Sequence, residues 1–120
     1  MTKKIYICSK IADYWLLRIF KINHLFILDP SNNLKYEIDV PRNSKGLIRI
    51  IVRKVNPIRI LRNKNINYKL VKVPVKTFYK KLNLARKIFE FKPYRLFWRN
   101  CWVFVKFFYP IKISLRGYLE

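Results

Sequence analysis

The fold of this chain is decided by residues 25–40, which read LFILDPSNNLKYEIDV. Leu25–Leu28 is a short apolar run followed by turn residues, as expected of a strand. The DPSNN that comes next is a strong turn signal, because Asp, Pro, Ser and Asn all favour tight turns. Leu34–Val40 then alternates between apolar and polar side chains, so its apolar residues share one face of a strand. The segment therefore predicts a β-hairpin.

Segments on both sides of this hairpin supply further predicted strands. Lys4–Cys8 alternates, and Leu47–Val55 is a β-branched run with basic residues at its outward positions. Tyr94–Phe108 is rich in aromatic residues and is expected to form two strands. A last strand is expected over Ile111–Leu115.

Thr77–Glu90 is the segment best suited to a helix. Its apolar residues recur at three- and four-residue steps and share one face, namely Phe78, Leu82, Ala85 and Phe89. Ile11–Ile22 also fits a short helix, although its Ile and aromatic content fits a strand nearly as well. Residues 41–46 are expected to form a loop, since they read PRNSKG.

The charge of the chain indicates the kind of partner. There are 27 Lys and Arg against 6 Asp and Glu, and residues 40–88 contain fifteen basic side chains and no acidic one. Like charges without an internal counter-charge repel one another, so a neutralising polyanion is expected, and structured RNA fits best. Because self-repulsion opposes compaction, we expect the fold to be completed on this partner.

These patterns predict an α+β protein with a small, mostly antiparallel β-sheet, one or two helices and basic extensions. Residues 1–120 are expected to form a single small RNA-binding domain. Residues 56–76 are expected to be a basic loop or extension, because Pro57–Lys72 has poor periodicity and Asn at 63, 65 and 67. This segment is either a solvated loop or, as we favour, an extension lying on RNA.

Side chains suited to catalysis or metal binding are scarce. His24 is the only histidine and lies on an apolar run, which favours a packed or RNA-facing role. Cys8 and Cys101 lie far apart, so we expect two buried or half-buried thiols and no structural zinc site. The chain is therefore expected to have no enzymatic activity, cofactor, metal or small-molecule substrate.

The carboxylates and glycines support the same expectation. Glu37 and Asp39 share a strand face with Lys35, which favours an ion pair over a catalytic carboxylate pair. The only glycines are Gly46 and Gly117, and neither lies in a phosphate-binding loop motif.

Targeting and membrane signals are weak. The most apolar stretch, Leu96–Pro110, is interrupted by Arg99, Asn100 and Lys106, so no transmembrane segment is expected. The N-terminus does not resemble a secretory signal, and we expect an uncleaved chain. Ile, Lys, Asn, Phe and Tyr fill 60 of the 120 positions, as in a very AT-rich genome such as that of an organelle or of certain protists. If the compartment is an organelle, we expect the gene to reside there.

Basic residues interleaved with aromatic ones form the candidate binding surface. Arg is the more informative of the two basic types, because it binds phosphate bidentately and an AT-rich genome favours Lys. The residues expected to contact RNA phosphates in the acid-free region are Arg42, Lys45, Arg49, Arg53, Lys54, Arg59, Arg62, Lys64, Lys69, Lys72, Lys80, Arg86 and Lys87. Arg95 and Arg99, near Trp98 and Trp102, form a second candidate patch.

The aromatic clusters in the last third are expected to serve the core or protein contacts. They are Tyr94-Phe97-Trp98 and Phe104-Phe107-Phe108-Tyr109. The sequence has neither the aromatic signature of an RRM nor the GXXG loop of a KH domain.

The size, charge and extensions of the whole chain resemble those of ribosomal proteins, especially the divergent ones encoded by protist mitochondrial genomes. Leu25–Ile38 is similar to the early strand–turn–strand of the large-subunit ribosomal protein six family. The segments Tyr79–Leu82, Tyr94-Arg95-Leu96 and Tyr109–Ile113 are similar to its later helix and strands. The chain departs from that family because most of its glycines are missing and the chain is shorter.

The sequence thus predicts a structural constituent of a mitochondrial ribosome, with rRNA and neighbouring ribosomal proteins as its partners. Lys and Arg would neutralise rRNA phosphates and hold a local RNA fold. One alternative is a peripheral accessory subunit of a respiratory complex of the mitochondrial inner membrane. Another alternative is a small basic DNA-binding protein.

Overall fold

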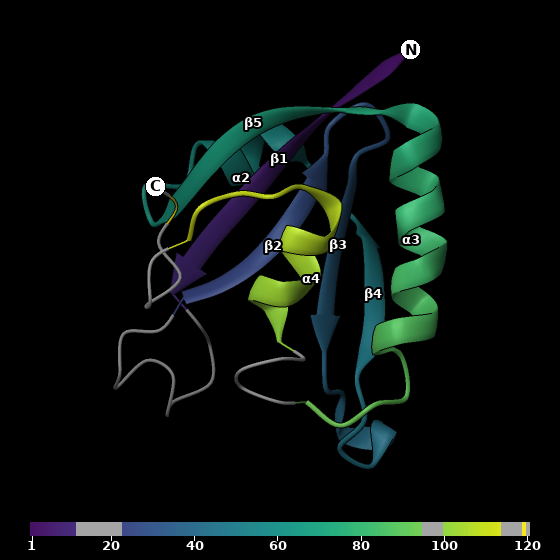
Figure 1. The fold of residues 1–120 in the computed structure, drawn as a ribbon. Coiled ribbons are helices and arrows are strands. Elements are labelled where there is room, and N and C mark those ends of the chain that lie inside the picture. The colour runs from purple at the N-terminus through teal and green to yellow at the C-terminus, as the bar shows by residue number, and fades with distance from the viewer. Residues whose placement is uncertain (12–22, 95–99, 114–118, 120) are drawn as a thin grey trace.

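Five antiparallel strands form the sheet on which the other elements pack (Figure 1). The computed structural model describes residues 1–11, 23–94, 100–113 and 119. Along the chain these residues form β1 (Thr2–Ile11), β2 (Asn23–Asp29), β3 (Leu34–Asp39), the 3-10 helix η1 (Arg42–Ser44), β4 (Arg49–Lys54), α2 (Pro57–Leu61), β5 (Ile66–Pro74), α3 (Val75–Phe89) and α4 (Cys101–Phe108). The strand order is β4-β3-β2-β1-β5. This confirms the predicted α+β fold with a mostly antiparallel sheet.

The predicted hairpin is formed by β2 and β3. Ile27 pairs with Tyr36 in the antiparallel register, and both side chains are buried. The turn between the strands closes at Asn33, whose φ of 55° lies in the left-handed region that Asn tolerates better than most residues. The predicted strands over Lys4–Cys8 and Leu47–Val55 are confirmed as β1 and β4, with slightly different ends.

The basic loop or extension predicted over residues 56–76 was wrong. Residues 57–61 form the short helix α2, whose first turn is capped by Asn56: its side chain accepts hydrogen bonds from the backbone N–H groups of Ile58 and Arg59. Residues 66–74 form β5, which pairs with β1 along its whole length. Because β5 is an edge strand with only Val71 and Val73 buried, its sequence lacks a strong apolar alternation.

Helix α3 confirms the predicted helix, beginning two residues earlier than expected. Its four buried residues are the four predicted from the spacing, Phe78, Leu82, Ala85 and Phe89. The strands predicted over Tyr94–Phe108 were wrong for Cys101–Phe108, which form α4. The Asn100 side chain caps this helix by accepting a hydrogen bond from Val103 N at 3.0 Å, and packing against the sheet overrides the β preference of its aromatic residues.

The remaining predictions are partly outside the described residues. Ile11 ends β1, and the helix or strand expected over residues 12–22 lies outside them. Residues 95–99 also lie outside. The strand expected over Ile111–Leu115 is not formed by residues 111–113, where Ile113 makes only an isolated bridge to Leu119; residues 114 and 115 are outside the described part.

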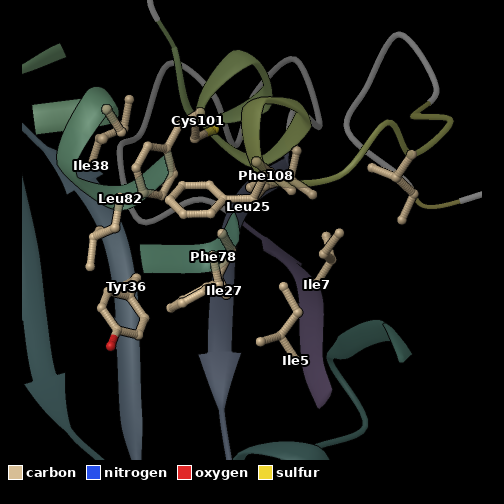
Figure 2. Packing of buried hydrophobic residues seen from close by; sticks show 14 of the residues in the cluster. Ile5, Ile7, Leu25, Ile27, Tyr36, Ile38, Phe78, Leu82, Cys101 and Phe108 are labelled. Atoms are coloured by element: carbon tan, nitrogen blue, oxygen red, sulfur yellow. The ribbon is translucent and has the colours of Figure 1, made fainter. Parts of the chain in front are cut away.

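The main core lies between one face of the sheet and helices α3 and α4. Figure 2 shows Ile5, Ile7, Leu25 and Ile27 from the sheet pointing toward Phe78 and the other helix side chains. The ring centroids of Phe78 and Phe108 are 5.4 Å apart, so the two helices also pack on each other. The aromatic residues of α4 therefore serve the core, as predicted.

A second, smaller cluster lies on the opposite face of the sheet. It contains Cys8, Phe26 and Leu28 from the strands, with Ile60 and Leu61 of α2 packed against them. Helix α2 belongs to the connection from β4 at one edge of the sheet to β5 at the other, which carries it across this face (Figure 1). The two faces of the sheet are thus covered by different helices.

Candidate nucleic-acid interface

The acidic residues of the described part are largely occupied by internal contacts. Asp29, at the end of β2, is fully buried, and its Oδ2 lies 2.8 Å from Lys3 Nζ, which is also buried. Ser31 and Asn32 of the following turn donate hydrogen bonds to the same carboxylate. Burial opposes ionisation, but the hydrogen bonds from Lys3, Asn32 and Ser31 outweigh it and lower the pKa of Asp29.

Glu37 on β3 is the second internal acid. Its Oε2 lies 3.1 Å from His24 Nε2 and 3.3 Å from Lys35 Nζ. Burial favours the neutral acid, but the hydrogen bond to His24 and the charge of Lys35 outweigh it, so the pKa of Glu37 falls to about 2. Burial likewise disfavours the charged imidazole, but hydrogen bonds to Cys101 and Glu37 raise the pKa of His24 to about 9. His24 is therefore a packed, ion-paired side chain.

This pair predicts a dependence of stability on pH. The raised pKa of His24 stabilises the fold fully below about pH 6.5, and the contribution is lost as the pH rises to about 9. The lowered pKa of Glu37 stabilises the fold above about pH 4.5, and that contribution is lost as the pH falls to about 2. Both contributions are fully present between about pH 4.5 and pH 6.5, so the difference in urea midpoint between wild type and Glu37→Gln should be largest in this range. A difference that stays constant with pH would show that packing, and not charge, is responsible.

The other two described acids lie nearer the surface. Glu90 follows α3, and its Oε2 lies 3.1 Å from Arg49 Nε. Asp39 is exposed, and its side chain accepts a hydrogen bond from the backbone N–H of Val40. Three of the four acids in this part of the chain are therefore neutralised by basic partners, and two of these partners, Lys3 and Lys35, are not in the predicted binding set.

The predicted phosphate-binding residues have the opposite distribution. All thirteen that the structure describes are exposed: Arg42, Lys45, Arg49, Arg53, Lys54, Arg59, Arg62, Lys64, Lys69, Lys72, Lys80, Arg86 and Lys87. Within the described part, Arg49 alone among them is ion-paired. Two of the four described acids, Asp29 and Glu37, are thus paired inside the fold, while the predicted basic residues are exposed to solvent.

Helix α3 organises part of this surface into a line. Lys76, Lys80, Asn83 and Lys87 follow one another at four-, three- and four-residue steps, so they share one side of the helix. All four are exposed, and the buried residues of α3 lie on the other side. Since a helix rises 1.5 Å per residue, the three lysines extend over about 16 Å. We call Lys76, Lys80 and Lys87 the α3 lysine line.

Of the remaining predicted residues, Arg86 also lies on α3, outside the α3 lysine line, and the rest are spread over other elements. Arg42 and Lys45 lie at η1, and Arg53 and Lys54 lie on the edge strand β4. Residues 59–72 supply the others, namely Arg59 and Arg62 at α2, Lys64 in the following turn, and Lys69 and Lys72 on the opposite edge strand β5. The candidate surface therefore extends over both edge strands, β4 and β5, and over α2 and α3.

The second predicted patch lies mostly outside the described residues, which do not include Arg95, Trp98 or Arg99. Trp102 is half-buried on α4, and its Nε1 donates a hydrogen bond to the backbone oxygen of Asn23 at 3.3 Å. Trp102 therefore holds α4 against β2.

Sequence reasoning missed three exposed residues, Lys76, Lys4 and Tyr68. Lys76 was left out, although its spacing to Lys80 and Lys87 places it on the same helix side. Lys4 and Tyr68 were left out because residues 66–74 were expected to be a loop. Their positions on the paired strands β1 and β5 were therefore not predicted. The signal for β5 lay in Val71 and Val73, which alternate with exposed residues.

The two cysteines are free and buried, as expected. Burial raises the pKa of the Cys8 thiol to about 12, with a small opposing effect of Lys35, which makes this thiol unreactive at neutral pH. Among the described residues, no three His, Cys, Asp or Glu side chains are grouped so that they could hold a metal ion.

Comparison with known proteins adds no relative. No family model matches this chain, and no match was found among curated proteins or solved structures. In the part of the chain that the structure describes, no helix is long and apolar enough to cross a membrane.

Proposed function

We propose that this protein is a structural, RNA-binding constituent of a mitochondrial ribosome. The observation that carries the proposal is the separation of charges: Asp29 and Glu37 are paired inside the fold, whereas the predicted basic residues are exposed and, apart from Arg49, have no ion-pair partner in the described part. Such a surface gains most from a polyanion, because each phosphate contact releases a condensed counterion.

The mechanism is electrostatic positioning. Lys and Arg side chains on α2, α3 and both edge strands bind rRNA phosphates, and phosphate contacts fix position without reading sequence. The rigid aromatic core keeps these elements at constant distances, so that RNA segments on different sides of the sheet are held together. The mitochondrial assignment rests on the AT-rich residue usage and on the resemblance to divergent organelle-encoded ribosomal proteins.

Sedimentation of a native organelle extract on a sucrose gradient tests this function. We expect the protein to migrate with one ribosomal subunit and to leave it after RNase treatment or at high salt, since phosphate contacts are salt-labile. Migration as a free monomer at physiological salt would contradict the proposal. Sedimentation with membranes, insensitive to RNase and high salt, would favour the accessory subunit of a respiratory complex.

A further inference from the structure

The face of the sheet opposite α3 and α4 is only partly covered. Cα partners in the register of β1 and β5 include Cys8 with Tyr68, Tyr6 with Leu70, and Lys4 with Lys72. Paired residues project to the same face. Because Cys8 belongs to the cluster under α2, these six side chains share the α2 face.

Tyr68 and Leu70 remain open beside α2. Their exposed fractions are 46% and 44%, although each is a large apolar side chain on a strand. The ring of Tyr68 stands edge-on to that of Tyr6, with centroids 5.5 Å apart and an interplanar angle of 82°. Since Tyr6 is half-buried and packs against the second cluster, it fixes the position of the Tyr68 ring.

The surroundings of this aromatic surface are basic. Lys4 and Lys72 are exposed and form the next cross-strand pair beyond Tyr6 and Leu70. Neither β1 nor β5 contains an acidic residue. An apolar protein surface would gain nothing from these charges, whereas a nucleotide brings both a base to stack and a phosphate to neutralise.

We propose that Tyr68, held by Tyr6, is a stacking platform for an unpaired base of single-stranded RNA, with Lys4 and Lys72 binding the adjacent phosphates. Aromatic side chains on the open face of a sheet are a general means of binding splayed RNA bases. The inference rests on the proposed RNA-binding function and specifies the part of the RNA that binds at this face, namely an unpaired loop or end. The α3 lysine line, on the other side of the sheet, binds phosphates separately.

Two oligomers of equal charge test the platform. Binding of fluorescein-labelled heptauridylate and of a labelled abasic heptamer to the full chain is measured by anisotropy. Tyr68→Ala should weaken heptauridylate binding about tenfold, within the range for loss of one stacked base, and leave binding of the abasic heptamer unchanged. Tyr68→Trp should retain the preference for heptauridylate over the abasic heptamer. This variant controls for a loss of binding that is caused by misfolding and not by the missing ring.

Tyr79→Ala is the matched control, because Tyr79 is an exposed tyrosine on α3, away from this face. It should leave the ratio of the two affinities unchanged. If wild type binds both oligomers and Tyr68→Ala keeps the wild-type ratio, the platform is wrong while RNA binding stands. If wild type binds neither oligomer at low salt, the RNA-binding function itself fails.

Discussion

Replacing Asp29 with alanine is expected to lower the free energy of unfolding by about 3–5 kcal/mol. The change leaves the Lys3 ammonium buried without its carboxylate, and removing one partner of a buried ion pair costs far more than the pair itself contributes. Among the described residues, Lys3 would keep only Ser31 Oγ at 3.2 Å and the rings of Phe78 and Tyr79, each 5.6 Å from Nζ. Urea unfolding followed by circular dichroism measures the effect.

Asp39→Ala is the control for this prediction. Both substitutions remove one negative charge from a strongly basic chain, so general self-repulsion increases equally. Asp39 is exposed, and among the described residues its carboxylate accepts a hydrogen bond only from the neighbouring backbone N–H, so we expect a change within about 0.5 kcal/mol. Equal, small effects in the two variants would show that Lys3 reaches water when its partner is absent.

Local patterns made the hairpin and α3 predictable from sequence. Alternation over Leu34–Val40 and the four- and three-residue steps of Phe78, Leu82 and Ala85 are visible within a dozen residues. Whether these segments form a hairpin and a helix depends little on the rest of the fold. The exposure of the basic residues was also predictable, because an uncompensated charge has no favourable place inside a core.

Long-range packing decided what could not be predicted. Strand β5 buries only Val71 and Val73, and its pairing partner β1 is the first strand of the chain, so its identity depends on a distant contact. Helix α4 has a strand-like aromatic composition, and its Asn100 cap matters only once Phe104 and Phe108 pack on the sheet. The ion pair of Lys3 with Asp29 and the contact of Tyr6 with Tyr68 follow from the same topology, and therefore no short sequence window contains them.

Neutralising the α3 lysine line by the triple substitution Lys76→Gln, Lys80→Gln and Lys87→Gln is expected to weaken RNA binding on the order of 10²-fold at 0.15 M salt. Each lysine that contacts a phosphate releases about 0.9 counterion, which corresponds to about fivefold at this salt concentration. The slope of log affinity against log salt should fall by about 2 to 3. Anisotropy of a labelled 20-base-pair RNA duplex over a range of KCl concentrations measures both quantities.

A second triple variant distinguishes the effect of where these charges lie from the effect of net charge alone. Lys92, Lys106 and Lys112 are exposed as well, but they lie after α3 and outside the predicted binding set. Substituting all three by Gln lowers the net charge by the same amount, so a purely non-specific attraction would weaken equally in both variants. We expect the control to keep most of the affinity and nearly the full salt slope, because these lysines make no phosphate contact. If both variants lose the same affinity and slope, then α3 is not the interface and net charge alone governs RNA binding.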